Sequence, residues 1–224
     1  MLINIRNALM AGKRLEPAQY YGCTPVMIPY RGNTNTPYIT SEGMLVLSNS
    51  NGTGGFGSGR ADLPFTTPRW DKAFEVAIKV VWKDKTNPYG IFGQNGNADG
   101  FTPFWLNNGV VSYMKNVGWP ITWNGGGTVF VTKPINQAQI LAMRYNGSSL
   151  YEAGVFENGS FVVKKQKTST GIVPGGGVLN IGSNRGSDSC LYADVDLNFC
   201  YIRFDGKLLW EGTEGAYERV NGMI

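Results

Sequence analysis

The chain has 224 residues, of which 16% are charged, 12% are aromatic and 31 are glycine, and its net charge is +4. It contains no histidine, which excludes Ser-His-Asp and Cys-His catalysis, HExxH metalloenzymes and ordinary zinc sites. The charges are spread thinly. The densest cluster, Lys164, Lys165 and Lys167, is typical of a solvated strand face rather than of a nucleic-acid site.

Signals for export and membrane insertion are missing from the sequence. No apolar run approaches the roughly 18 residues that a membrane span requires, and polar residues interrupt the apolar core that a signal peptide would need within residues 1–14. The three cysteines are an odd count, which excludes a full disulfide framework. Cys190 and Cys200 could pair if their strands are neighbours, but free thiols are favoured in a chain without an export signal. We expect synthesis in a cytoplasm.

The first part of the chain follows no clear period. Apolar residues near its start have helical spacing, but several prolines before residue 40 forbid any long regular element. We interpret residues 1–43 as an irregular anchor segment that packs on a partner or on the following domain. Residues 44–47 form the first predicted strand, and the glycine-rich stretch 51–59 is predicted to be a mobile loop.

The middle of the chain alternates in the manner of half-buried strands. Apolar residues stand at every second position from Phe74 to Val80, and the strand continues to Trp82. Turn signals of the Asn-Gly type separate further short strands. These strands are predicted over residues 89–92, 101–106, 110–114, 128–132, 140–145, 150–156 and 161–165. Because nothing helical separates them, they predict an all-β sandwich rather than a parallel sheet.

The stretch from Val178 to Gly212 reads as three short strands separated by turns. It begins with an apolar strand and a loop rich in Gly, Asn and Arg. From Tyr192 the apolar residues alternate and then change parity, which a one-residue bulge near Asn198 explains. Asp205-Gly206 supplies the pair of positive φ angles that a two-residue hairpin needs, and the chain then returns in a last strand.

This C-terminal pattern resembles the end of the concanavalin A-like, laminin-G-like jelly roll. The sequence Leu-Trp-Glu-Gly at Leu209–Gly212, with Gly-Ala-Tyr at Gly215–Tyr217, is similar to versions in bacteriophage virion proteins of the tail, fibre or capsid-decoration kind. The resemblance covers roughly Phe65–Tyr217. It is specific for the fold rather than for the function, because this fold serves lectins, hydrolases and pure spacers.

The resemblance implies a domain organisation and a role. A concanavalin A-like jelly-roll β-sandwich is expected over residues 44–212, after the anchor segment 1–43 and before a C-terminal tail, 213–224. The implied function is a non-enzymatic virion structural protein, an appendage, fibre or capsid-decorating subunit, that is assembled in the host cytoplasm. We expect it to contact other virion proteins through the anchor segment, to form a homo-oligomer and to bind host-surface glycans, with no nucleic acid and no membrane insertion.

The aromatic run between Phe101 and Trp123 is the strongest signal for ligand binding. Sugars stack their C–H faces on aromatic rings, while amides and charged groups take the hydrogen bonds of their hydroxyls. The alternative, that the rings fill the core or meet a neighbouring subunit, stays open. The predicted glycan-binding residues are Trp119, Trp123, Tyr113, Asn124, Asn184 and Arg185.

Two loop motifs imitate cofactor sites. Residues 52–57 satisfy G-x-G-x-x-G, but no helix follows them, so we interpret them as a loop and not as a nucleotide site. Asn95, Asn97 and Asp99 imitate the first half of a calcium loop, although Leu106 occupies the place of the bidentate glutamate. A plain turn is favoured there, and calcium is the one cofactor that the sequence leaves open.

Two alternative functions remain. A carboxylate-dependent glycoside hydrolase or lyase of the same fold would need paired carboxylates, or a Tyr or Lys base with an arginine, that meet in a cleft. The nearest pair, Asp194 and Asp196, shares a strand face but lacks the expected glutamates. The other alternative is a pure assembly module without a ligand, in which the lectin face is a subunit interface and the C-terminal tail, with Tyr217 and Val220, is an interaction element.

Overall fold

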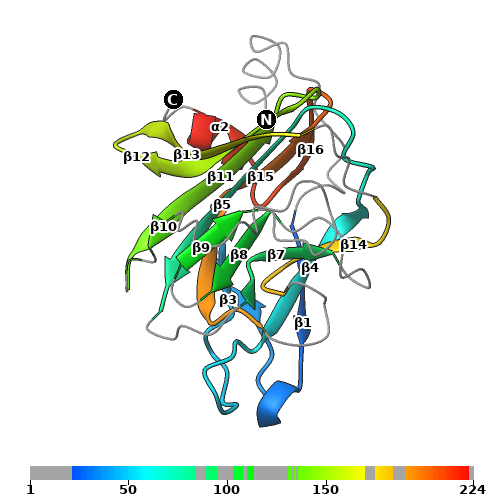
Figure 1. The fold of residues 1–224 in the computed structure, drawn as a ribbon. Helices are drawn as coiled ribbons and strands as arrows, with labels where there is room; N and C mark the ends of the chain where they lie inside the picture. The colour runs from blue at the N-terminus through cyan, green and yellow to red at the C-terminus, as the bar shows by residue number, and fades with distance from the viewer. Residues whose placement is uncertain are drawn as a thin grey trace, which may run out of the picture.

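The computed structural model describes residues 22–83, 89–94, 103–107, 110–113, 131–132, 134, 136–169, 175–183 and 190–221. Within these residues the secondary structure is sixteen strands, one 3-10 turn, η2, and one short helix, α2 (Figure 1). Neighbouring strands pair antiparallel throughout, as in the hairpin of β11 and β12 and in the long-range pair of β5 and β15. The predicted all-β class is confirmed.

One layer of the molecule is a large sheet with the strand order β13-β12-β11-β5-β15-β3-β2, in which β16 also pairs with β15. Neighbours such as β5 and β15 are far apart in the chain, which is the crossover pattern of a jelly roll rather than of a simple meander. The strands are β2 (Tyr38–Ile39), β3 (Met44–Val46), β5 (Phe74–Trp82), β11 (Ala138–Tyr145), β12 (Leu150–Glu157), β13 (Ser160–Thr168), β15 (Ala193–Phe204) and β16 (Lys207–Glu211).

The opposite layer consists of two four-stranded sheets with the orders β1-β4-β14-β7 and β10-β9-β8-β6. Only Ile91 separates β6 from β7, so the two sheets continue one another across the front of the large sheet (Figure 1). The strands are β1 (Thr24–Met27), β4 (Gly59–Thr66), β6 (Tyr89–Gly90), β7 (Phe92–Gln94), β8 (Phe104–Asn107), β9 (Val110–Tyr113), β10 (Val131–Thr132) and β14 (Val178–Ile181).

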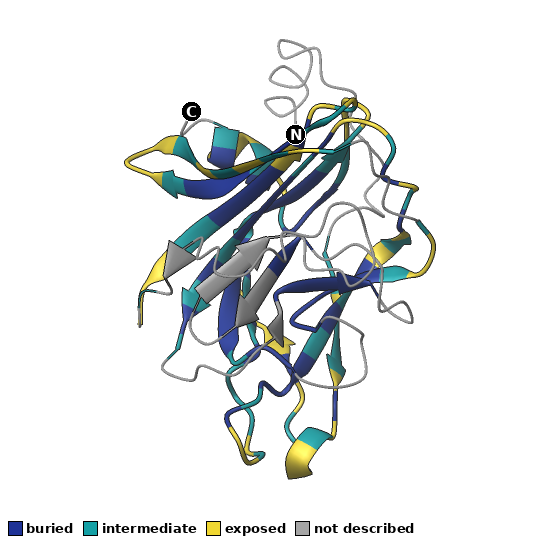
Figure 2. Ribbon diagram, in the orientation of Figure 1, coloured by how far each residue is buried: buried dark blue, intermediate teal, exposed yellow. Residues whose placement is uncertain are grey.

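The main core lies between the two layers. Every second residue of β5, from Phe74 to Trp82, is buried in it, as the alternation predicts. Trp70, Trp82 and Trp210 are its largest fully buried side chains, so these rings fill space rather than bind ligand. Figure 2 shows the buried residues running through the middle of both layers, whereas the exposed ones gather on loops and on β13.

β15 is irregular at the position where the sequence pattern changes parity. The step from Asp196 to Tyr201 in β15 is matched by the step from Lys79 to Ala77 in β5, so three extra residues are accommodated. The predicted bulge near Asn198 is confirmed in place, but it is larger than one residue. Hydrogen bonds hold it, because the Asn198 amide donates to Glu42 O and accepts from Thr213 Oγ1.

The structure differs from the sequence analysis in the segments that flank the core. Within the expected irregular segment, β1 pairs with β4 and β2 pairs with β3, so the described part of this segment, from residue 22, contributes edge strands to both layers. The glycine-rich stretch 51–59 contains buried residues, among them Gly57 and Ser58, and packs tightly instead of forming an open loop.

The C-terminal segment carries helix α2 (Ala216–Asn221), which packs on the outer face of β15. Val220 is buried there, and the Tyr217 ring lies edge-on to Tyr201 with 5.0 Å between the ring centroids. The Glu211 carboxylate accepts hydrogen bonds from the N–H groups of Gly215 and Tyr217. In the described residues no helix has the length and apolarity that crossing a membrane takes.

Candidate functional site

The glycan-binding and metal residues predicted from the sequence lie outside the part of the chain whose side chains the structure describes. Tyr113 ends β9 and its backbone pairs with Phe104, but its side chain is not among those described. The residues outside the described ranges are Trp119, Trp123, Asn124, Asn184, Arg185, Asn95, Asn97 and Asp99. Their roles stay predictions.

The carboxylate pair Asp194 and Asp196 has a structural role. Lys83 Nζ lies 3.0 Å from Asp194 and Lys79 Nζ lies 2.8 Å from Asp196. Asp194 Oδ1 also accepts the N–H of Leu47, and Asp196 Oδ1 accepts the amide of Asn198. The side chains are only 11% and 12% exposed. Both carboxylates are therefore engaged in ion pairs and hydrogen bonds of the fold. They do not line an open groove, as the hydrolysis of a glycosidic bond requires.

The cysteines offer no nucleophile. None of Cys23, Cys190 and Cys200 forms a disulfide, and Cys190 and Cys200 are fully buried. Burial, assisted by Asp62, raises the pKa of the Cys23 thiol to about 12, and burial also raises the pKa of Cys200. A thiol that stays protonated is a poor nucleophile and a poor metal ligand. Among the described residues no three His, Cys, Asp or Glu side chains gather as a metal site.

The surface that the described residues do assemble is the loop end of the sandwich, which we define as residues 28–37 and 48–58. It lies at the lower end of the molecule in Figure 1 and carries η2 (Tyr30–Gly32). Asn33 holds it together from within, because its amide donates to Ile28 O and Ser58 O at 3.1 and 2.8 Å. Asn33 is only 1% exposed, so the exposed turn stands on a buried, hydrogen-bonded base.

Glycines let the second loop of the loop end approach its neighbours closely. A Cβ on Gly57 would stand 2.1 Å from the Leu191 carbonyl oxygen, and one on Gly59 would stand 2.1 Å from Val26 O. Gly54 has φ +83, and a Cβ there would lie 2.9 Å from the Phe56 ring. These glycines serve backbone packing and the placement of one ring. The interpretation of the G-x-G-x-x-G match as a loop is therefore confirmed, since strand β4 and not a helix follows it.

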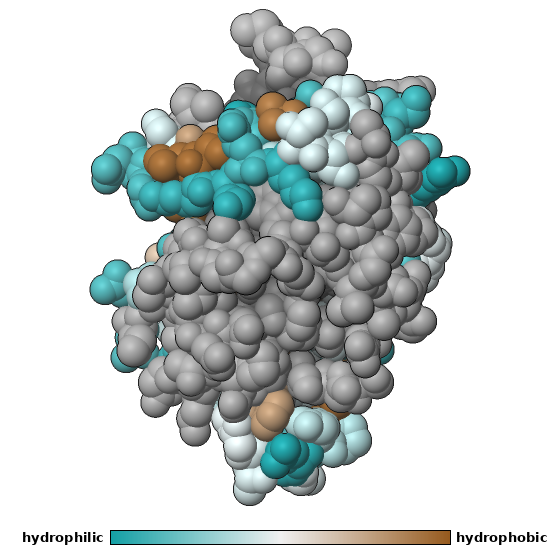
Figure 3. Space-filling model, in the orientation of Figure 1, coloured by the Kyte–Doolittle hydropathy of each residue, from teal (hydrophilic) through white to brown (hydrophobic). Residues whose placement is uncertain are grey.

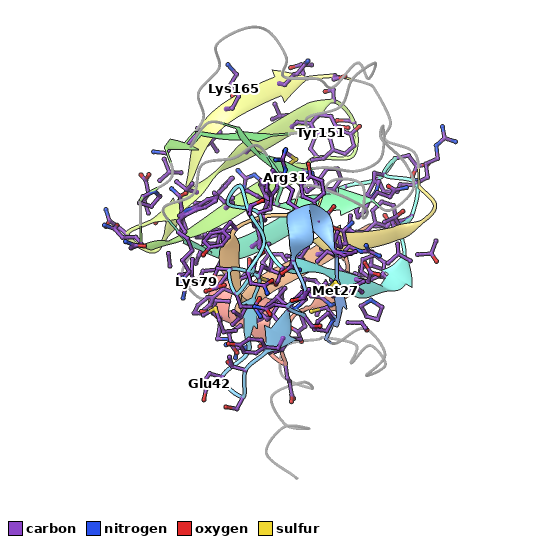
Figure 4. The ribbon with its side chains drawn as sticks, turned by 90° about the horizontal axis from the view of Figure 1, so that it is seen from below. Met27, Arg31, Glu42, Lys79, Tyr151 and Lys165 are labelled. Carbon is purple, nitrogen blue, oxygen red and sulfur yellow. The ribbon has the colours of Figure 1, made fainter. Side chains whose placement is uncertain are left out.

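Two aromatic rings and one cation meet at the tip of the loop end. The rings of Tyr30 and Phe56, one from each loop, pack edge to face with their centroids 4.7 Å apart. The Arg31 guanidinium carbon lies 5.6 Å from the Tyr30 centroid and 5.2 Å from the Phe56 centroid. Arg31 is exposed and both rings are half-buried, so the cluster presents one polar and two aromatic groups to solvent. Figure 4, seen from below, shows Arg31 on the turn that faces the viewer.

The backbone at this tip is held in an unusual conformation. Arg31 has φ 52 and ψ 39, in the left-handed region that a residue other than glycine enters at a cost of about 1 kcal/mol or more. Two hydrogen bonds maintain it, from Asn33 N to Tyr30 O and from Thr53 N to Arg31 O. Such strain is concentrated at binding sites in proteins, where it fixes a side chain in place. The structure thus favours the loop end as the candidate site.

A second candidate is the outer face of the large sheet, the face that points away from the main core. An apolar cluster covers it, and a shallow groove in it is lined by Glu75, Ala142, Met143, Arg144, Phe156 and Phe161. The Arg144 guanidinium lies over the Phe161 ring at 5.0 Å. Figure 3 views the molecule from the side of the smaller sheets and not from this face; it shows hydrophobic atoms rimmed by hydrophilic ones near the β12–β13 hairpin.

The charged groups of the outer face are compensated within the sheet. Arg144 Nε lies 2.5 Å from Glu152 Oε2, and Gln166 donates to the other oxygen of Glu152 at 2.7 Å. Burial raises the pKa of Glu152, but the hydrogen bonds from Arg144 and Gln166 outweigh it and lower the pKa overall. Glu75 likewise accepts a hydrogen bond from Tyr201 and lies beside Arg203. This face therefore offers apolar area but few unused polar groups.

The cluster of Tyr30, Arg31 and Phe56 was not predicted from the sequence. Its two loops are separated in the chain by β2 and β3, and nothing in the sequence pairs them. The available signal was composition, because Phe56 is the one large apolar side chain in the stretch 51–59. A ring among glycines has few neighbours that could bury it.

Comparisons with known proteins bear on the fold. No protein-family model matches the chain, and no curated protein matches it. It is similar to the crystal structure of the botulinum neurotoxin serotype G binding domain, with 14% sequence identity and a TM-score of 0.54 over 92% of this chain and 47% of that chain. It is also similar to a mutant of HCR/D, with 12% identity and a TM-score of 0.50 over 93% of this chain and 48% of that chain.

The chain therefore spans about half the length of these solved chains. At such low identity the likeness concerns the fold alone. It agrees with the antiparallel two-layer architecture and identifies a jelly-roll β-sandwich of the concanavalin A-like class. The predicted fold class is confirmed.

Proposed function

We propose that this chain is a non-enzymatic, lectin-like binding module whose loop end binds a glycan. The observation that carries the proposal is the cluster of the exposed Arg31 with the half-buried rings of Tyr30 and Phe56 at a strained and hydrogen-bonded turn. Rigid rings beside a few placed polar groups are the usual make-up of a small-ligand site. A preformed turn also reduces the entropy that binding costs.

Three further observations support a binding role over catalysis. The carboxylates Asp194 and Asp196 are engaged in ion pairs and backbone contacts, and the thiols of Cys190 and Cys200 are fully buried. The fold is shared with a toxin domain that is named for binding. Because a jelly roll hosts many functions, a glycan ligand is proposed from the loop end and from the aromatic run between Phe101 and Trp123.

The finer part of the proposal is that the module belongs to a bacteriophage virion, as an appendage, fibre or capsid-decorating subunit. Its support is the sequence resemblance at Leu209–Gly212 and Gly215–Tyr217. A single lectin site binds weakly, at about millimolar Kd or 4 kcal/mol, and copies repeated on a particle convert such binding into avidity. Homo-oligomerisation and contacts to other virion proteins through the N-terminal segment, residues 1–43, are part of the same proposal.

The second candidate function is an assembly module. The observation that favours it is the apolar cluster of the outer face, in which Ile140, Phe156, Phe161 and Phe199 are only partly buried. Exposed apolar area of this kind marks interaction surfaces on soluble proteins. The outer face and the loop end are distinct surfaces, so one chain can serve both functions.

The experiment that tests the proposal is a glycan array probed with purified protein, with and without calcium, alongside its mass in solution. We expect retention of defined glycans, with binding lost in Tyr30→Ala and Phe56→Ala. Phe161→Ala is the matched control, because it removes a half-buried ring that also neighbours an arginine, on the outer face. Variants Trp119→Ala and Trp123→Ala test the site predicted from the sequence. An array left blank by folded wild-type protein would leave assembly as the function.

A further inference from the structure

Four cations lie over aromatic rings within the described part of the chain, and they differ in whether they also pair with a carboxylate. Lys79 lies 3.9 Å from the Phe199 centroid, and Arg203 lies 4.9 Å from that of Tyr217. Together with Arg144 over Phe161 and Arg31 over Tyr30 and Phe56, they form the set. All four cations contact rings, so a ring contact alone does not distinguish a ligand-binding cation from one that only packs.

Three of these cations also hold a carboxylate. Lys79 pairs with Asp196 at 2.8 Å, Arg144 pairs with Glu152 at 2.5 Å, and Arg203 lies 3.6 Å from Glu75. Among the described residues Arg31 has no such partner, and its side chain makes no hydrogen bond. A guanidinium carries five N–H donors in a planar fork that fits carboxylates and similar oxyanions. At Arg31 this capacity is unused.

The geometry leaves the Arg31 fork accessible from its edge. The guanidinium carbon lies over the Tyr30 and Phe56 rings at 5.6 and 5.2 Å from their centroids, and these contacts use no N–H donor in a hydrogen bond. The N–H donors of a guanidinium lie in its own plane, so an exposed guanidinium can donate outward while its carbon rests near the rings. The restrained backbone at φ 52 fixes where the side chain begins.

We propose that the loop-end site takes an acidic saccharide, with Arg31 pairing with the anionic group and Tyr30 and Phe56 contacting the sugar ring. This inference rests on the proposed function and names the class of its ligand. The bidentate pairing of Arg with a planar carboxylate is stronger and more directional than a neutral hydrogen bond. The net charge of +4 assists the approach of an anion at low ionic strength.

The test is a glycan array that pairs each acidic glycan with a neutral counterpart lacking only the acidic group. Carboxylated and sulfated members form separate arms, which distinguishes the two kinds of anion. We expect wild-type protein to prefer the acidic member of a pair by about tenfold or more, as a hydrogen bond to a charged group predicts. We also expect this preference to weaken as the salt concentration rises.

The variants separate the charge from its geometry. Arg31→Gln is expected to lose the acidic preference, and Arg31→Lys to retain part of it, because lysine keeps the charge but not the planar fork. Arg144→Gln is the matched control, since it removes a guanidinium stacked on a ring of the outer face, and it should bind as wild type. Circular dichroism checks that each variant is folded.

The outcomes that contradict the two proposals differ. Equal binding of acidic and neutral counterparts, or an acidic preference that survives Arg31→Gln, would overturn this inference and leave the glycan-binding function standing. An array on which folded wild-type protein binds no glycan would overturn both. Loss of binding in Arg144→Gln but not in Arg31→Gln would move the site to the outer face and would also overturn the inference.

Discussion

The loop end and the outer face of the large sheet both place an arginine against an aromatic ring, but only the arginine of the outer face is paired with a carboxylate among the described residues. On the outer face Arg144 is held by Glu152, which Gln166 holds in turn, across three neighbouring strands. At the loop end Arg31 rests on two rings from two loops and meets no carboxylate among the described residues. The charged side chains of the outer face are thus paired within the sheet, whereas the Arg31 guanidinium keeps the hydrogen-bonding capacity that the proposed ligand would use.

The backbone shows the same division. In β11 and β12 the residues around Arg144 and Glu152 follow a regular antiparallel register, and the ion pair crosses directly opposed positions. At the loop end the backbone is held by side-chain hydrogen bonds from Asn33 and by close approaches at Gly57 and Gly59. A ligand site needs a fixed but exposed backbone, and hydrogen-bonded loops on a rigid sandwich supply one.

The largest expected effect comes from removing the close approach at the base of the loop end. In Gly57→Ala the new Cβ would stand 2.1 Å from Leu191 O, so we expect a loss of more than about 3 kcal/mol in the free energy of unfolding. Urea denaturation measures it. Gly32→Ala is the control, because it has φ +81 but open space around the Cβ, and about 1 kcal/mol is expected there. Equal losses would contradict the close-packed account of the loop end.

Asn33→Ala removes the buried hydrogen bonds that support the loop end. The variant removes the Asn33 amide donor from Ile28 O and Ser58 O, each of which keeps one backbone N–H donor, and we expect a loss of about 1–3 kcal/mol with weakened glycan binding. Asn146→Ala is the control, since this exposed turn residue accepts N–H bonds from Ser148 and Leu150 and should cost about 1 kcal/mol with no effect on binding. Thermal unfolding measures the stability of both variants, and titration with a glycan measures their binding.

Arg31→Gly is expected to raise the stability of the protein and to lower its glycan binding. Glycine adopts the observed φ of 52 without strain, so we expect a gain of about 0.5–1 kcal/mol in unfolding free energy and a loss of glycan binding. Asp205→Gly, at φ 51 in the β15–β16 hairpin, should leave binding unchanged. If Arg31→Gly destabilised the protein, Arg31 would be a structural residue and the site would be elsewhere.

The smallest expected effect concerns the ion pair of the outer face. The pKa of Glu152 is lowered overall in the folded protein, so the pair contributes stability above the ordinary pKa of 4.5 and loses it as the pH falls through the lowered value. Glu152→Gln should cost about 0.5 kcal/mol at neutral pH and nothing in strong acid. Unfolding measured across this pH range should show the two proteins converge, and glycan binding at neutral pH should be unaffected.

Sequence alone predicted the central strands because burial leaves a clear alternation in them. β5 is apolar at every second residue, and Asp205-Gly206 in the last hairpin has the positive φ angles that its residue types favour. Strand β1 was not predicted because the prolines before residue 40, Pro25 among them, were interpreted as breaking regular structure. Pro25 lies in β1, at the edge of its sheet, where a missing N–H is tolerated.

The candidate site was harder to predict than the fold. Tyr30 and Phe56 become neighbours only because Asn33 and the close approach at Gly57 bring two loops together, and such contacts have no period in the sequence. That Arg31 lacks a carboxylate partner among the described residues can be recognised only in the structure, by comparison with the ion pairs of the other cations that contact rings. The tryptophans predicted from the sequence, Trp119 and Trp123, remain a prediction that the variants above can test.

The most direct measurement is the map of backbone amide NMR signals that shift when an acidic glycan from the array is added. The account predicts that the shifts concentrate in residues 28–37 and 48–58, with Arg31 and Phe56 among the strongest, and that they vanish in Arg31→Gln. Shifts confined to β11, β12 and β13, with the loop end unchanged, would contradict the central claim and make the outer face the binding surface.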